Sequence, residues 1–126
     1  MTAKPFSITL VSVLFIAFVD HSAMAANAAQ GKQIFEQRCQ ACHSIEPGVN
    51  KFGPSLAGVV GRKAATVPGF NYSDALKHSG LVWTEKNLNK WLTNPHTFVP
   101  GDKMPFPGLK SATERDDVIQ YLKQSG

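Results

Sequence analysis

The spacing of apolar and polar residues predicts a chain of short helices separated by long loops. The first predicted helix covers residues 28–42, begins at Asn27 with Gln30 in the capping-box position, and carries Phe35 on its apolar stripe. Gly31 lies one turn before Phe35. A glycine inside a helix costs about 1 kcal/mol relative to alanine, so Gly31 indicates either a close crossing by another helix or a tolerated exception.

Three further helices follow from the same pattern. A short polar helix is predicted at residues 73–79, and a longer one at residues 85–93, with Thr84 as its N-cap and Pro95 beyond its end. Thr113 is the predicted N-cap of the last helix. The apolar face of that helix is formed by Val118, Ile119, Tyr121 and Leu122. No segment alternates with the period of a strand and no repeat is present, so the predicted class is all-α.

Residues 44–72 carry no helical period, because glycines and prolines interrupt every apolar run. Irregular segments of this length in a compact domain are usually functional or wrapped around something. We therefore expect this segment to enclose a bound group rather than to contribute a helix.

The N-terminus has the layout of a secretory signal peptide. Lys4 precedes an apolar run at residues 6–19, and a polar break then leads to a triplet of mostly small residues that ends at Ala25. We expect residues 1–25 to be this signal peptide, with cleavage after Ala25, and residues 26–126 to be the mature domain. The run is shorter than the roughly 18 apolar residues of a membrane span, and an uncleaved anchor is the alternative.

Composition sharpens the picture of the mature domain. The 126-residue chain is 43% hydrophobic, but much of that apolar content lies in the predicted signal peptide. The domain that remains is small and short of core residues, so something else must fill or staple its interior. A large multidomain enzyme and a membrane channel are excluded. The net charge is +4, but the chain has no dense Lys/Arg tract, so nucleic-acid binding is disfavoured. The mild positive charge favours an acidic protein partner.

Both cysteines of the chain, Cys39 and Cys42, lie in the motif C-Q-A-C-H that ends at His43. A disulfide is the default for an exported chain. A thioredoxin-like site needs a strand before the motif, where a helix is predicted. Zinc needs four ligands, and no second Cys/His pair is suitably spaced. The motif C-x-x-C-H favours covalent haem attachment, with both thiols reaching one side of the porphyrin and His43 binding the iron.

Met104 is the only methionine outside the predicted signal peptide. It lies in a loop from Pro100 to Pro107, whose prolines stiffen the backbone and can hold one side chain inward. A thioether is a common sixth ligand of an electron-transfer haem and raises its reduction potential. The rival ligands are His78, at the end of a polar helix, and His96, in a loop. Gap filling in the core is the other alternative for Met104.

These residues resemble the class I cytochromes c along the whole mature domain. The resemblance implies the cytochrome c fold, with several short helices and long loops wrapped around one covalently bound haem. It implies haem c attached through Cys39 and Cys42, with His43 and Met104 as the iron ligands. It also implies that the carbonyl of Pro54 accepts a hydrogen bond from the ligand imidazole.

The resemblance further implies that Arg62, Tyr72 and Trp83 lie near a haem propionate. The alternatives are a solvated surface charge for Arg62 and ordinary core positions for the two aromatic residues. Two positions depart from the family pattern, because Trp91 stands where a tyrosine is frequent and Asp102 where a threonine is usual. The apolar walls of the haem crevice are expected to be Phe35, Leu56, Leu92 and Phe106.

The predicted function is that of a periplasmic mono-haem electron carrier, not an enzyme, because the protein fills both axial positions of the iron. We expect a monomer that exchanges electrons with a cytochrome bc complex and a terminal oxidase, or with a photosynthetic reaction centre or a periplasmic dehydrogenase. Lysines that flank the ligand segments would steer acidic partners. They are Lys32, Lys51, Lys103 and Lys110. A ligand-binding or peroxidatic haem protein and a thiol-based protein without haem are the alternatives.

Overall fold

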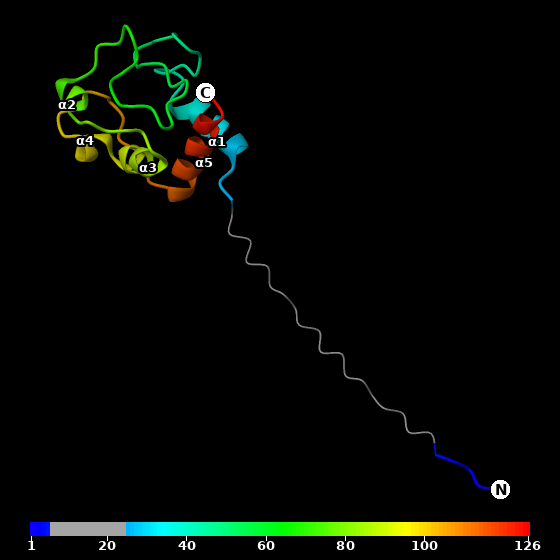
Figure 1. Ribbon diagram of the computed structural model, residues 1–126. Coiled ribbons are helices and arrows are strands. Elements are labelled where there is room, and N and C mark those ends of the chain that lie inside the picture. Colours follow the sequence, from blue (N-terminus) through cyan, green and yellow to red (C-terminus); the bar gives the residue numbers. More distant parts are fainter. Residues whose placement is uncertain (6–24) are drawn as a thin grey trace.

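The computed structural model describes residues 1–5 and 25–126, in which short helices are joined by long loops (Figure 1). The helices of the described residues are α1 (Ala28–Arg38), α2 (Asp74–Lys77), α3 (Glu85–Thr93), α4 (Pro95–Phe98) and α5 (Ala112–Lys123). An isolated antiparallel bridge joins Lys63 to Val82, and the described part of the chain contains no strand. The prediction of an all-α fold is confirmed.

The predicted signal peptide, residues 1–25, falls largely on residues 6–24, which lie outside the described residues. Cleavage after Ala25 and the alternative of an uncleaved anchor therefore stay predictions. Within the two described ranges, no helix is both long and apolar enough to cross a bilayer.

Helices α1 and α5 cross in close contact on one side of the domain (Figure 1). The crossing is close because Gly31 has no side chain: a Cβ atom there would lie 1.9 Å from the backbone oxygen of Asp117. One turn further along α1, the rings of Phe35 and Tyr121 meet with their centroids 5.5 Å apart. Of the two interpretations of Gly31, the close helix crossing is therefore confirmed.

The start of α1 is fixed by the predicted cap. The side-chain oxygen of Asn27 accepts hydrogen bonds from the backbone N–H groups of Ala29 and Gln30. The backbone N–H of Asn27 itself donates to the carboxylate of Asp117 on α5 at 2.6 Å. The first residues of the domain are thereby tied to its last helix.

The end of α1 differs from the prediction, because the helix stops at Arg38 and not at residue 42. Cys39 leaves helical geometry, with a φ of −122°. The chain then makes a turn in which the N–H groups of Cys42 and His43 both donate to the carbonyl of Cys39, at 3.0 and 2.9 Å. The apolar stripe of the sequence cannot show where the helix gives way to this turn, because the same residues can face the interior in a helix or in a turn.

Helix α3 has the predicted bounds and the predicted cap, Thr84. The chain does not enter a loop after α3, however. Asn94 caps the single-turn helix α4 by accepting from the N–H of Thr97 at 3.1 Å, and Pro95 occupies the first helical position, where no N–H is needed. His96 was predicted in a loop and instead lies on α4, where it is exposed.

Helix α5 begins earlier than predicted, and Thr113 is not its N-cap. Ser111 is the cap, and its hydroxyl accepts from the N–H of Glu114 at 3.3 Å. The guanidinium of Arg115 donates to the carbonyls of Leu109 and Lys110 at 2.7 and 2.9 Å. These bonds hold the residues just before the helix and so favour the earlier start.

The irregular segment of residues 44–72 is confirmed as a helix-free stretch that arches over the molecule between α1 and α2 (Figure 1, teal to green). Side chains bonded to backbone groups hold it in shape. The hydroxyl of Ser55 donates to the carbonyl of Glu46 at 2.6 Å. The Asn50 amide accepts from the N–H of Ser55 and donates to the carbonyl of Pro68, both at 3.0 Å.

We expect Gly31→Ala to lower the free energy of unfolding by about 2 kcal/mol, net of a small gain in helix propensity. The added methyl group would overlap the carbonyl of Asp117 and force α1 and α5 apart. Denaturant unfolding followed by far-ultraviolet circular dichroism measures the change. Gln33→Ala, on the exposed face of α1, should stay close to wild type. A Gly31→Ala protein of undiminished stability would contradict the close crossing.

Candidate functional site

A cavity of about 500 Å³, a size typical of cofactor and ligand sites, lies within the domain. Its walls are mostly apolar and come from segments far apart in the sequence. They include Leu56, Val59, Leu76, Leu88, Leu92 and Phe106. Every residue predicted as a haem or iron contact lines this one cavity, namely Cys39, Cys42, His43, Arg62, Tyr72, Trp83 and Met104.

The predicted crevice walls are confirmed for Leu56, Leu92 and Phe106, whereas Phe35 does not line the cavity. Phe35 is buried instead against Tyr121, where α1 crosses α5. The sequence could not separate these two environments, because an apolar side chain on α1 suits either of them.

Cys39 and Cys42 lie in the turn that follows α1, as half-buried free thiols beside the cavity. Burial raises the pKa of the Cys39 thiol from 9.0 to about 11, and the positive charge of Arg38 offsets only part of this effect. A thiol of this kind is protonated at neutral pH, unlike the low-pKa thiolates of thioredoxin-like sites. The raised pKa of Cys39 therefore disfavours the redox-thiol alternative.

His43 is held as a neutral imidazole with one nitrogen available. Its Nδ1 lies 2.8 Å from the carbonyl oxygen of Pro54, and because a carbonyl can only accept, Nδ1 carries a proton. In the neutral imidazole, Nε2 is then the unprotonated nitrogen. Burial lowers the pKa of this imidazole, which favours the neutral form that binds metals. Gly53 makes room for the ring, since a Cβ atom there would lie 2.5 Å from Cε1 of His43.

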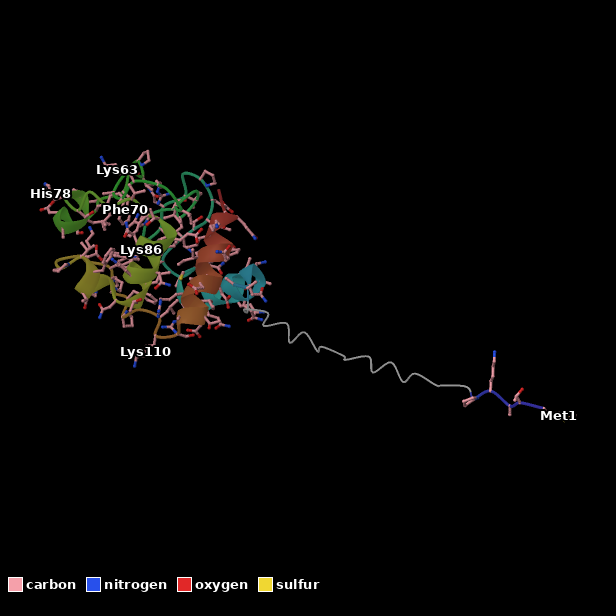
Figure 2. The ribbon with its side chains drawn as sticks, turned by 60° about the horizontal axis from the view of Figure 1, so that its bottom comes forward. Met1, Lys63, Phe70, His78, Lys86 and Lys110 are labelled. Atoms are coloured by element: carbon pink, nitrogen blue, oxygen red, sulfur yellow. The ribbon has the colours of Figure 1, made fainter. Side chains whose placement is uncertain are left out.

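Met104 reaches the same cavity from the loop between α4 and α5 and is half-buried. Its backbone N–H donates to the carboxylate of Asp102 at 2.8 Å. The rival ligands lie elsewhere. His78 and His96 are exposed and do not line the cavity, and His78 lies at the outer edge of the molecule (Figure 2).

Arg62 and Tyr72 bring polar groups to the largely apolar cavity. The guanidinium of Arg62 donates to the carbonyls of Ser55 and Ala57 at 3.1 and 2.7 Å. The hydroxyl of Tyr72 accepts from the N–H of Val67 at 3.2 Å. Burial lowers the pKa of Arg62 and raises the pKa of Tyr72. Arg62 is thus part of the cavity lining and not the solvated surface charge of the alternative interpretation.

Several lining residues were not singled out from the sequence. Trp91 was named only for its departure from the family pattern, and it forms a wall with Trp83, their ring centroids 5.2 Å apart. Phe52 and Phe70 line the cavity from the irregular segment, and Phe52 is 73% exposed. The spacing of apolar residues could not find these two phenylalanines, because that segment has no period that separates an inner from an outer face. Phe70 lies in a motif, Gly69 to Tyr72, that also belongs to the family resemblance.

The residues around the cavity fit a haem. Two thiols and an imidazole with an available nitrogen come from one turn, and a thioether comes from a second segment. This mixed nitrogen and sulfur donor set suits haem iron rather than a hard cation. In the described residues, no group of three or more His, Cys, Asp and Glu side chains could hold a metal ion by itself, so the zinc alternative has no support there.

The sequence matches the family model described as Cytochrome c over residues 28–126. The chain belongs to the cytochrome c family. It is 49% identical to cytochrome c type-1 of Ascaris suum over 94 residues, which cover 75% of this chain and 84% of the relative. It is 55% identical to cytochrome c2 iso-2 of Magnetospirillum molischianum over 85 residues, which cover 68% and 88%. The structure of cytochrome cH from Methylobacterium extorquens matches with a TM-score of 0.73 at 46% identity and covers 78% of this chain and 98% of that one.

Membership of this family confirms the predicted cytochrome c fold. Cytochromes c are electron carriers rather than enzymes, and the motif of Cys39, Cys42 and His43 implies that this cytochrome c holds one covalent haem c. The alternative of a thiol-based protein without haem is thereby excluded.

We expect Gly53→Ala to displace the imidazole of His43, because the new Cβ atom would overlap Cε1 and Nδ1 of the ring. Loss of the bond to Pro54 should change the haem spectrum and lower the free energy of unfolding by roughly 1–3 kcal/mol. Circular dichroism in the Soret region and denaturant unfolding of the purified red protein measure both effects.

Gly61→Ala is the matched control for this substitution. The φ of Gly61 is +87°, which strains an alanine, but no atom lies within 4 Å of the added Cβ. It should lower stability by about 1 kcal/mol and leave the Soret signal unchanged. Equal spectral changes in the two variants would argue against a special role for Gly53.

Proposed function

We propose that this cytochrome c is a periplasmic mono-haem electron carrier in which Cys39 and Cys42 attach the haem and His43 and Met104 bind its iron. The observation that carries the proposal is that all four side chains line one largely apolar cavity. The cavity receives two thiols and an imidazole from one turn and a thioether from another segment, which is the donor set of a c-type electron-transfer haem.

A haem bound here supplies a ferric/ferrous couple that gains and loses one electron. The protein would fill two ligand positions on this iron in both oxidation states. His43 offers the unprotonated Nε2 of a ring held by Pro54. Met104 offers a soft thioether, which favours ferrous iron. With both positions taken, no site is open for oxygen or peroxide, and this favours a carrier over a peroxidatic protein.

We assign the propionate end of the haem to Arg62, Tyr72 and Trp83. Arg62 places a cation beside the cavity, and the Tyr72 hydroxyl accepts from a backbone N–H, which leaves its own proton free to donate. The indole of Trp83 can only donate. A cation with two donors can stabilise a carboxylate in an apolar site that would otherwise penalise its charge.

Export to the periplasm is proposed from the signal-peptide layout of residues 1–25. Two similar proteins, cytochrome c2 iso-2 of Magnetospirillum molischianum and cytochrome cH of Methylobacterium extorquens, come from bacteria and support this location. The attachment of c-type haem takes place outside the cytoplasm, which agrees with export of this chain.

Basic residues at the cavity support an acidic redox partner. Arg38 and Lys103 line the cavity and are exposed, and Lys51 is exposed beside the cavity residue Phe52. Lys110 also projects into solvent (Figure 2). The proposed partners of the monomer are a cytochrome bc complex and a terminal oxidase, or a photosynthetic reaction centre or periplasmic dehydrogenase. Electrostatic attraction between the basic residues and an acidic partner would speed their association.

Met104→Ala should keep the covalent haem but lose the charge-transfer band between methionine sulfur and ferric iron, and the reduction potential should fall. The reason is that a soft ligand favouring ferrous iron has been removed. Redox titration with absorption spectra measures both changes. His78→Ala and His96→Ala are the controls and should match wild type. An unchanged spectrum in Met104→Ala, or rapid carbon monoxide binding by the ferrous wild type, would contradict the axial assignment.

Lys51→Glu should lower the rate constant for electron exchange with a purified cytochrome bc complex about tenfold at low salt, because steering charge beside the cavity is reversed. The wild-type rate should itself fall as salt rises. Lys86→Glu makes the same charge change in a separate groove between α3 and α5, and its effect should be clearly smaller. Equal losses in both variants would point to net charge alone.

A further inference from the structure

Asp102 is a buried acid with two specific partners. Its side chain lines the cavity, and the residue is only 9% exposed. One carboxylate oxygen accepts from the N–H of Met104 at 2.8 Å, and the other accepts from the hydroxyl of Ser73 at 3.1 Å. A carboxylate is rarely buried unless its charge is satisfied by such bonds.

The bond to Ser73 links Asp102 to a distant helix. Ser73 is the N-cap of α2, and its oxygen accepts from the N–H of Leu76 at 3.1 Å. The Ser73 hydroxyl has a single proton, and it donates this proton in the hydrogen bond to Asp102. A continuous chain of hydrogen bonds therefore runs from the start of α2 through Ser73 and Asp102 to the backbone of Met104. We call these three residues the Asp102 clasp.

A second contact joins the same two segments. The ammonium of Lys103 donates to the carbonyl of Asn71 at 2.5 Å and lies over the ring of Phe70, 5.9 Å from its centroid. Residues 71–73 and 102–104 are thus bonded side by side, although they are far apart in the sequence. The clasp is the part of this contact that reaches Met104 itself.

The segment around Met104 has no helix or strand to hold it. Residues 102–111 are irregular, and the preceding Gly101 has a φ of +90°. The N–H of Met104 therefore depends on the carboxylate of Asp102 for its hydrogen bond.

We propose that Asp102 is a positioning residue that keeps the thioether of Met104 directed into the cavity by anchoring the Met104 backbone to the cap of α2. This inference rests on the proposed role of Met104 as an iron ligand. With the clasp open, the Met104 segment would move away from the site more easily, and an added ligand would compete better with Met104 for the iron. The role follows from the contacts of this chain, in which an aspartate occupies the position of the usual threonine.

The test is imidazole binding to the purified ferric protein, followed by loss of the charge-transfer band. Asp102→Ala removes both bonds and should raise the apparent imidazole affinity by about tenfold or more, as expected for the loss of the hydrogen bonds that hold the Met104 segment. Asp102→Asn keeps an oxygen that can accept from Met104 and an amide that can donate to Ser73. It should stay within about threefold of wild type.

Two further variants complete the test. Ser73→Ala cuts the clasp at its far end and should give an intermediate increase, which keeps the proposal testable if Asp102→Ala does not fold. Asp116→Asn is the matched control, because this exposed carboxylate on α5 bonds to Asn89 at 3.1 Å and is remote from the cavity lining. It should bind imidazole as wild type does.

The outcomes separate this inference from the proposed function. If the wild-type protein lacks the charge-transfer band, Met104 is not an iron ligand, and the proposed role of the clasp loses its basis. If the band is present, equal affinities in Asp102→Ala and Asp116→Asn would overturn the role of Asp102 alone. Equal increases in Asp102→Ala and Asp102→Asn would also overturn it, because charge and not the hydrogen bonds would then be the cause.

Discussion

The contact between the backbones of α1 and α5 is the constraint on which the rest of the site depends. Gly31 lets α1 approach the carbonyl of Asp117, and the Asp117 carboxylate holds the N–H of Asn27. With α1 fixed in this way, the turn that follows it delivers two thiols and an imidazole to one place. The partner helix α5 contributes Val118 and Leu122 to the cavity wall. A single close approach of two helices therefore positions both the attachment turn and the surface opposite it.

The two proposed iron ligands are held by different physical means. His43 lies in the turn that follows α1. Its ring is bonded to the carbonyl of Pro54 and lies close against the backbone of Gly53. Close packing of this kind leaves the ring little freedom. Met104 lies on an irregular segment, and its backbone N–H depends on a single hydrogen bond to Asp102. The site thus combines a rigid ligand with a releasable one.

The sequence was informative wherever the signal was local. The caps Asn27 and Thr84 need only neighbours a turn away, and the C-x-x-C-H spacing carries its own chemistry. Local rules failed where two candidates satisfied them equally, as at the start of α5, where contacts made by Arg115 favour Ser111 over Thr113. They were silent on contacts between distant segments, such as the bond from Ser73 to Asp102, because residues 29 apart share no periodicity.

The order of the elements also bears on how the protein matures. The helices in closest contact, α1 and α5, are the first and last helices of the described chain. Their contact closes a loop of nearly the whole domain, so the α1–α5 crossing needs residues from both ends of the domain to be present. Tyr121, near the C-terminus, supplies the ring that packs on Phe35 in α1. A chain that ends before α5 would therefore lack both this packing and the cavity wall formed by Val118 and Leu122, although the turn with Cys39 and Cys42 would be present.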